Sequence, residues 1–327
     1  MNYISVYNTN FSYSKNWTYP PLLHAFILSR YIRMYYAQLI KTLRENNTYE
    51  TRVSTIINPF SLYYICDHYY GDEPRHRNFP YVPKEKHDLL VTNDISRIKE
   101  FDIIHCQVDY FNKFCNEILD KIEKKFILTT GQWYLPQIQK SELTEKILNH
   151  KNVVLWASQN PIYDNTEKYM AFPYGIEHVH LTAYVDCLLS RPVVSNIEKS
   201  KDLVYLPISN ATNPCRRKLP AIPRIPVTEY YSRLTEAKFV LSPIGDRDDC
   251  FRHYEAIGLG TIPISNVNDF YKNIFTTNMI YANIDDMVKM LDKDSFHQMY
   301  EEPNKDLICL EYYKNILEKR IMNILKY

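Results

Sequence analysis

The sequence predicts an α/β protein whose two Rossmann-like domains, built on parallel sheets, face each other across a cleft. A length of 327 residues is enough for two domains of ordinary size. The 45% hydrophobic and 24% charged fractions, with a net charge of +1, are typical of a folded chain and exclude a disordered one. Strand-like and helix-like segments alternate with short links over residues 101–176 and again over 203–264. Such alternation favours right-handed βαβ units, whose ligands bind beyond the carboxyl ends of the strands.

The region before residue 101 is less regular. We expect a short strand over residues 3–7 and a helix over 21–45, in which apolar residues recur every three or four positions. The Pro- and His-bearing range 67–86 is predicted to be a surface loop.

The first alternating series completes a first domain over residues 1–177. Its predicted elements are strands over 102–108, 125–130 and 152–156, and helices over 110–122 and 141–148. Residues 178–200 show no clear period, and we place the linker between the domains there.

The second series gives a second domain over residues 201–306. Its predicted elements are strands over 203–207, 239–242 and 261–264, and helices over 228–237 and 249–259. Thr228 is the expected N-cap of the first of these helices. A strongly periodic helix over 307–327 ends the chain, and we expect it to pack back on the first domain.

The cysteines and the apolar stretches indicate in which cellular compartment the protein is expected. The seven cysteines form no C-x-x-C pair and have no His cluster at ligand spacing, so we expect neither a disulfide framework nor a zinc site. The most apolar early stretch, 21–40, contains Arg30 and Arg33, so we expect no transmembrane segment. No signal peptide is recognised, and the composition favours a cytoplasmic protein of viral or bacterial origin.

The segment 239–265, FVLSPIGDRDDCFRHYEAIGLGTIPIS, holds the candidate binding residues. It contains three of the six glycines of the chain. Gly245 lies in a strand-to-helix turn, with Ser242 and Pro243 before it, where a missing side chain lets a phosphate approach backbone N–H groups. Gly258 and Gly260 are better explained as a helix exit.

Arg252 and Glu255 share one face of the helix that follows this turn, because they lie three residues apart. A carboxylate can accept hydrogen bonds from the two hydroxyls of a ribose, and an arginine can clamp phosphate oxygens. An exposed ion pair between the two is the alternative.

Asp246 and Asp248 form a D-x-D pattern, and paired carboxylates suit a divalent cation that bridges phosphates. Capping of the next helix by either residue is the explanation we favour, so no metal is expected.

The same segment closely resembles the C-terminal motif of exostosin-like glycosyltransferases, approximately FxLxPxGxxxDxxRxxEALxxGxIPI. The matching positions are Phe239, Leu241, Pro243, Gly245, Asp249, Arg252, Glu255, Ala256, Gly260, Ile262, Pro263 and Ile264. The stretch 203–217 looks like the family's strand and "TNPxR" turn, and residues 156–160 with 173–176 look like its "WFxQN … PxGI" pair. The resemblance covers about residues 125–265 and leaves the first hundred unmatched.

The resemblance implies a GT-B fold and a hexosyl- or pentosyltransferase. It implies a UDP- or GDP-sugar donor on the second domain, a glycan, glycoprotein or lipid-linked acceptor on the first, and an inverting, metal-independent reaction. By position, Glu255 would hold the ribose, Arg252 and one of Arg216 and Arg217 would neutralise the diphosphate, and Gly245 would line its approach. Asp249 matches the family's aspartate. Breaking the glycosidic bond leaves a charged nucleoside diphosphate that preorganised donors must stabilise.

A general base for the acceptor hydroxyl should lie at the carboxyl end of a strand in the first domain. Asp109, directly after the strand 102–108, is the first candidate, and His105 and Asp67 follow. Capping of the next helix by Asp109 and a buried structural role for His105 are the alternatives.

The family often has an aspartate after the "TG" at residues 130–131, where this chain has Gln132, Trp133 and Tyr134. The two aromatic rings suit stacking on a sugar, but the lost aspartate keeps open a second hypothesis, a catalytically silent sugar- or nucleotide-binding module. A third hypothesis, nucleic-acid binding, rests on basic runs such as 216–218, and the near-zero net charge argues against it.

Overall fold

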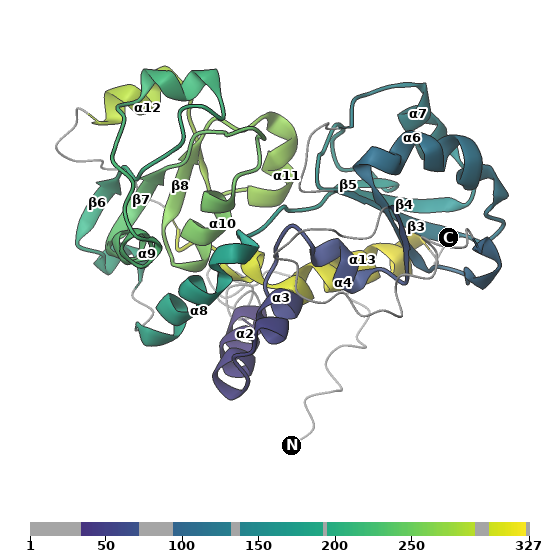
Figure 1. The fold of residues 1–327 in the computed structure, drawn as a ribbon, viewed down its shortest axis with the longest axis horizontal. Helices are drawn as coiled ribbons and strands as arrows, with labels where there is room; N and C mark the ends of the chain where they lie inside the picture. Colours follow the sequence, from purple (N-terminus) through teal and green to yellow (C-terminus); the bar gives the residue numbers. More distant parts are fainter. Residues whose placement is uncertain (1–33, 72–93, 132–137, 192–194, 292–300, 325–327) are drawn as a thin grey trace, which may run out of the picture.

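A computed structural model describes residues 34–71, 94–131, 138–191, 195–291 and 301–324, which form two α/β halves (Figure 1). The predicted strand over 3–7, the first part of the predicted helix over 21–45 and residues 72–86 of the predicted loop lie outside the described residues.

The first half is built on a sheet of five described strands that are all parallel and follow one another in chain order. They are β1 His68–Tyr70, β2 Ile103–Gln107, β3 Phe126–Gly131, β4 Val153–Ser158 and β5 Tyr169–Ala171. The three predicted strands are present, with β3 buried at every residue, as expected for a sheet covered on both faces. The surface-loop prediction is wrong at 68–70, because Tyr69 and Tyr70 are buried on the sheet's edge strand.

The helices of the first half differ in regularity. They are α2 Met34–Glu45, α3 Tyr49–Thr55, α4 Ser61–Ile65, η3 Ile95–Arg97 and α7 Glu142–Asn149. α7 begins where predicted, because Ser141 and Thr144 form a capping box. The helix predicted over 110–122 is present as an unbroken helical run over 108–121 that changes type along its length: η4 Val108–Tyr110, α6 Phe111–Lys113, the π-helical η5 Phe114–Ile118 and η6 Leu119–Lys121.

The span between the sheets, 178–200, is more ordered than its sequence pattern indicated. It contains η7 His178–His180, α8 Leu181–Ser190 and η8 Asn196–Glu198. α8 buries Leu181, Tyr184 and Val185 and packs against α2, α3 and α9. The connection is therefore part of the core and not a free linker.

The second half is built on four described parallel strands, again in chain order: β6 Lys201–Val204, β7 Ala237–Leu241, β8 Ile262–Ser265 and β9 Ile280–Tyr281. Its helices are η9 Pro214–Lys218, α9 Val227–Glu236, α10 Phe251–Gly258, η10 Asp269–Tyr271, α11 Lys272–Phe275, α12 Ile284–Leu291 and η11 Lys305–Ile308. The expected cap of α9 is wrong, because Pro226 holds the N-cap position and Thr228 lies within the helix.

The last helix, α13 Leu310–Ile324, packs back on the first half, which confirms the expectation (Figure 1). The ring of Tyr313 lies 5.5 Å from that of Phe172, and Arg320 Nη1 donates to the Thr166 carbonyl at 2.7 Å. One cluster of buried side chains accordingly runs through both halves, from Leu155 in β4 to Val240 in β7.

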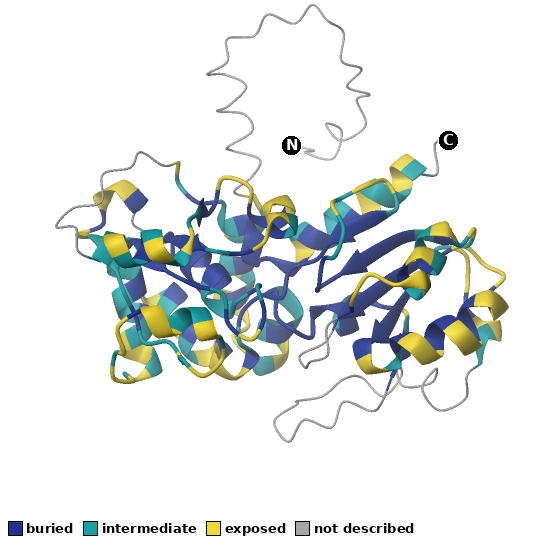
Figure 2. Cartoon of the chain, turned by 90° about the horizontal axis from the view of Figure 1, so that it is seen from above, coloured by how far each residue is buried: buried dark blue, intermediate teal, exposed yellow. Residues whose placement is uncertain are grey.

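The architecture is thus α/β with two parallel sheets, consistent with two Rossmann-like domains. The strands are largely buried, and the helices expose their outer faces (Figure 2). Among the described residues, no helix combines the length and apolar character needed to cross a membrane.

Candidate ligand-binding site

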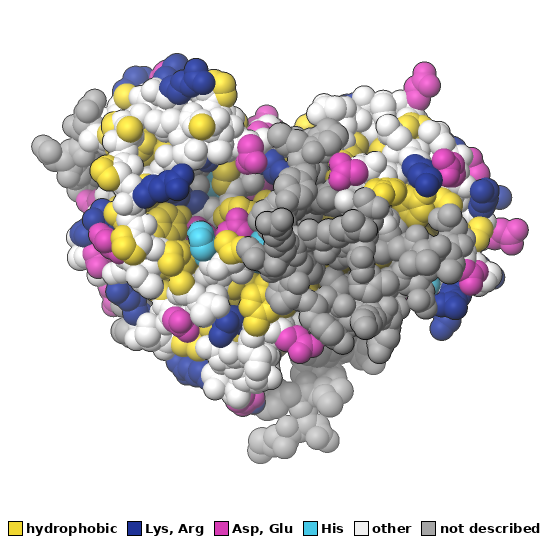
Figure 3. All heavy atoms as spheres, viewed as in Figure 1, with side chains coloured by type: hydrophobic (Ala, Val, Ile, Leu, Met, Phe, Trp, Pro, Cys, Tyr) yellow, Lys and Arg dark blue, Asp and Glu magenta, His cyan; other side chains and the backbone are white. Residues whose placement is uncertain are grey.

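A cavity of about 940 Å³ lies where the carboxyl ends of β6 and β7 meet the start of α10. Its walls come from both halves: Tyr174, Glu177 and His180; Pro207, Ile208, Ser209, Thr212 and Arg216; Arg224, Ile225, Val227 and Tyr230; and Ser242, Pro243, Gly245, Asp246, Arg247, Asp249, Cys250, Phe251, Arg252 and Glu255. Figure 3 shows the surface hollowed between the two lobes. The carboxyl ends of parallel strands are where α/β sheets bind ligands.

The turn into α10 is closed by a cysteine and not by an aspartate. Cys250 is the N-cap, with its side chain accepting from the helix and the His253 imidazole accepting from the Cys250 N–H at 3.3 Å. Asp248 is hydrogen-bonded to Asn268, and Asp246 is exposed. The expectation that Asp246 or Asp248 caps this helix is therefore wrong.

Glu255 is a buried carboxylate in the cavity wall, 4% exposed. The hydroxyl of Tyr230 donates to its Oε2 at 2.8 Å, and that of Tyr231 donates to its Oε1 at 3.1 Å. Burial raises the pKa of Glu255, and the hydrogen bond from Tyr230 and the charge of Arg252 oppose that rise. Because each carboxylate oxygen has two acceptor sites, each can still take one hydrogen bond from a ligand hydroxyl.

Arg252 is held by the backbone and not by an acid. Its Nη1 donates to the Leu241 carbonyl at 3.2 Å and its Nη2 to that of Pro207, while Nε donates to the Tyr230 hydroxyl at 2.9 Å. No carboxylate of the described residues forms an ion pair with it, so the alternative of an exposed pair with Glu255 is wrong. Tyr230 instead links the two by accepting from one and donating to the other, and the guanidinium keeps its positive charge.

The two neighbouring arginines of η9 have different environments. Arg216 lines the cavity, with Nε donating to Ile244 O and Nη2 to Pro243 O, both at 2.7 Å. Burial lowers the pKa of its guanidinium. Arg217 is exposed and outside the cavity wall. Of the two candidates for the diphosphate, the geometry favours Arg216.

The Pro-Ile-Gly turn lines the cavity, and its glycine N–H is used within the turn. The Gly245 N–H donates to the Arg247 carbonyl at 2.9 Å, so this N–H is not directed at a ligand. A Cβ at this glycine would lie 3.1 Å from Arg216 Nη2, which explains the small residue by the space that the arginine needs. Ser242 and Pro243 both line the cavity, and the buried Ser242 hydroxyl has no partner among the described residues.

Asp249 lines the cavity and joins the two halves. Its Oδ2 accepts from the Tyr174 N–H at 2.8 Å and from the Tyr254 hydroxyl at 2.7 Å, and it is 3% exposed. Oδ1 lies 3.6 Å from His253 Nδ1. The geometry gives Asp249 a positioning role between residues 173–176, here called the PYGI turn, and α10.

The candidate bases from the first sheet all lie outside the cavity wall. His105 is 1% exposed, with Nδ1 3.0 Å from Thr129 Oγ1 and its ring stacked 5.7 Å from that of Tyr69. Burial lowers its pKa to about 3, so the imidazole is neutral and enclosed. His105 therefore has the buried structural role that was the alternative to a catalytic one.

Asp109 and Asp67 lie at opposite ends of the parallel strands of that sheet, Asp109 at the carboxyl ends and Asp67 at the amino ends. Asp109 is exposed just beyond β2 and accepts from Gln107 Nε2 at 3.2 Å. Asp67 precedes β1 and accepts from the Ile103 N–H at 2.8 Å, which places it at the amino ends of the strands, away from the predicted edge. Trp133 and Tyr134 lie outside the described residues.

Several lining residues had no predicted role: Glu177, His180, Arg224 and Tyr230. The signal that could have located the first two is the neighbouring PYGI turn, in which Gly175 has φ of 87°. Only glycine adopts such a backbone readily, so the turn marks a fixed site.

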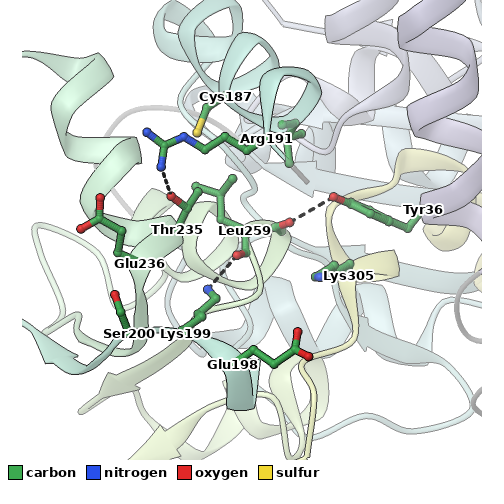
Figure 4. Close-up of a pocket in the computed structure, with 12 residues that line it drawn as sticks. Tyr36, Cys187, Arg191, Glu198, Lys199, Ser200, Thr235, Glu236, Leu259 and Lys305 are labelled. Carbon is green, nitrogen blue, oxygen red and sulfur yellow. Dashed lines mark hydrogen bonds between the residues drawn. The ribbon is translucent and has the colours of Figure 1, made fainter. Parts of the chain in front are cut away.

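A second cavity, of about 380 Å³, lies at the other end of α10 (Figure 4). Lys199 Nζ donates to the Leu259 carbonyl at 2.9 Å and to Thr261 Oγ1 at 2.7 Å, and Arg191 donates to Thr235. Burial lowers the pKa of Lys199 to about 7. Lys199 thus satisfies the Leu259 carbonyl at the C-terminus of α10, and its burial there has a structural explanation.

Among the described residues, no group of three His, Cys, Asp or Glu side chains is placed to hold a metal ion. In comparisons with known proteins, no family model matches the chain and no curated protein matches it.

Proposed function

We propose that the protein is a glycosyltransferase of the GT-B type that uses a nucleoside diphosphate sugar, UDP- or GDP-linked, and acts on a glycan or glycoconjugate acceptor. One observation carries the proposal: Arg252 and Glu255, both in the segment that resembles the exostosin-like motif, are linked through the Tyr230 hydroxyl and line a cavity at the carboxyl ends of parallel strands. The resemblance also implies inversion at the sugar and a reaction without an obligatory metal.

The charges in the cavity suit such a donor. Arg216 and Arg252 are both positively charged, and both donate hydrogen bonds to backbone carbonyls. These bonds orient the guanidinium groups without cancelling their charge. Charges fixed before the reaction stabilise the diphosphate that forms as the glycosidic bond breaks. Glu255, with acceptor sites remaining, matches the paired hydroxyls of a ribose.

The silent binding module is the second candidate, and it shares every donor contact. The observation that favours it is the position of Asp109, His105 and Asp67, none of which lines the cavity. Slow release of free sugar from a labelled donor separates the two, because a binding module shows only saturable affinity.

The donor-site assignment predicts different effects for matched arginine variants. Arg252→Gln should weaken calorimetric binding of UDP or GDP about 10- to 100-fold, since a hydrogen bond to a charged group contributes about 1.5–3 kcal/mol. Arg217→Ala, outside the cavity, should leave the affinity within about twofold. Equal affinities for wild type and Arg252→Gln, with both proteins folded, would contradict the assignment.

A further inference from the structure

Glu177 is an acid in the cavity wall that the donor site does not use. It lies between the PYGI turn and η7, on the segment that leaves the first half, and its side chain is 14% exposed. Arg216, Arg252 and Glu255 belong to the second half. Glu177 therefore reaches the cavity from the half that would bind the acceptor.

The segment that carries Glu177 is fixed on both sides. The Ile176 N–H donates to the Ile57 carbonyl at 2.9 Å, and the Tyr174 N–H donates to Asp249. A Cβ at Gly175 would lie 2.4 Å from the backbone of Ile57, so the turn is packed directly against another chain segment. A catalytic group on such a support keeps its position between binding events.

A buried histidine lies beside the carboxylate and limits the positions that it can take. Glu177 Oε1 lies 3.0 Å from His178 Nδ1, and His178 is 1% exposed with its ring 4.9 Å from that of Phe60 in an edge-on contact. A base held by a third group is the arrangement that proton-abstracting sites share. Glu177 Oε1 accepts no hydrogen bond of regular geometry from the described residues, and the side chain lines the cavity.

The other carboxylates of the wall are less suited. Asp249 holds the Tyr174 N–H and the Tyr254 hydroxyl, and Glu255 holds two tyrosine hydroxyls. Asp246 is exposed on the turn before α10, within the donor segment.

We propose that Glu177 is the general base of the transfer, with His178 as its positioning residue; this rests on the proposed function. The acceptor O–H proton passes to the Glu177 carboxylate while the acceptor oxygen bonds to the anomeric carbon. The bond from that carbon to the phosphate oxygen breaks, and its electron pair leaves with the nucleoside diphosphate. Water replaces the acceptor in donor hydrolysis, with the same proton transfer and free sugar as product.

The test compares Glu177→Gln with Asp109→Asn, an exposed acid outside the cavity wall. Release of free sugar is measured from labelled UDP-glucose, UDP-N-acetylglucosamine and GDP-mannose, and affinity for UDP and GDP is measured by calorimetry. Glu177→Gln should lose about 10²- to 10⁴-fold in hydrolysis, the usual contribution of a general base, and keep its diphosphate affinity within about twofold. Asp109→Asn should hydrolyse the donor at the wild-type rate.

Other outcomes overturn the proposal in distinguishable ways. If Glu177→Gln hydrolyses the donor at the wild-type rate, Glu177 is not the base. The same holds if His180→Gln loses hydrolysis and Glu177→Gln does not. Lost diphosphate affinity in Glu177→Gln assigns it to the donor site instead. If Glu177→Gln does not fold, Glu177→Ala should recover hydrolysis on addition of formate, and no recovery contradicts the role. A wild-type protein that binds no diphosphate refutes the proposed function itself, and one that binds but never hydrolyses is the silent module.

Discussion

At the scale of single residues, the buried carboxylate of Glu255 shows how a candidate binding residue can cost stability. The side chain is held by two tyrosine hydroxyls in a wall that excludes most water. Its raised pKa means that the native state binds this proton more tightly than the unfolded chain does. The stabilisation from the bound proton is present at low pH and is lost as the pH rises through the native pKa.

Glu255→Gln should therefore gain stability relative to wild type as the pH rises from 4 to 7, because the amide keeps the shape and cannot ionise in the buried site. The advantage should shrink as the pH falls, because the wild-type carboxyl takes up its proton. Affinity of the variant for UDP or GDP should fall at the same time, because substitutions that stabilise a protein at a functional site commonly reduce its function. Thermal melting at the two pH values, with calorimetry at pH 7, measures both effects. A variant that is less stable at pH 7 and no different at pH 4 would show that the ionised carboxylate stabilises the fold.

The sequence pattern predicted which side chains line the cavity. It was less successful in predicting which contacts each of them makes there. Spacing of three placed Arg252 and Glu255 on one face of α10, and both line the cavity. The use of the Gly245 N–H and the choice of Arg216 over Arg217 depend on which backbone carbonyls lie nearby. The first contact joins residues two positions apart and the second joins residues 28 apart, and the periodicity of the sequence encodes neither.

At the scale of elements, the limits of the sequence pattern follow from length. Strands of four to seven residues were predicted, whereas β1, β5 and β9 have three residues or fewer and are too short to show a period. The helical period over 110–122 was real, but the structure divides it at a π-helical turn that buries Phe114 and Cys115. Tertiary packing decides such interruptions.

The buried Lys199, which donates to the carbonyl of Leu259 at the C-terminus of α10, predicts that the stability of the protein depends on pH. The native pKa of Lys199, about 7, lies below that of an unfolded lysine, so the unfolded chain holds the proton over the pH range between them. The free energy of unfolding should rise with pH from 7 to 8, by at most about 1.4 kcal/mol per unit. Urea unfolding at several pH values measures this slope. Lys199→Met should flatten it, and an unchanged slope in that variant would assign the effect to other groups.

At the scale of the whole molecule, the two sheets share one buried cluster, and α13 crosses between them. Residues from β4, β5, α9, β7 and α10 contribute to that cluster together with Tyr313 and Leu317 of α13. Asp249 adds a polar link from the PYGI turn to α10, next to the cavity. Residues 178–200 reinforce the connection, because α8 packs on elements of both halves. Such continuity predicts that the two halves unfold together, although each has its own sheet.

Tyr313→Ala tests this coupling, because the side chain is 3% exposed, packs on Phe172 and donates to the Leu307 carbonyl at 3.1 Å. Removing a large buried ring should cost about 3–5 kcal/mol, since a cavity replaces its contacts. If the halves form one cooperative unit, calorimetry should show a single transition that moves to lower temperature with its van't Hoff and calorimetric enthalpies still equal. Met322→Ala, at a 56% exposed position of the same helix, should leave the transition nearly in place. Two separate transitions in Tyr313→Ala would mean that the halves are independently stable, and the cavity between them would then have to be assembled by the ligand.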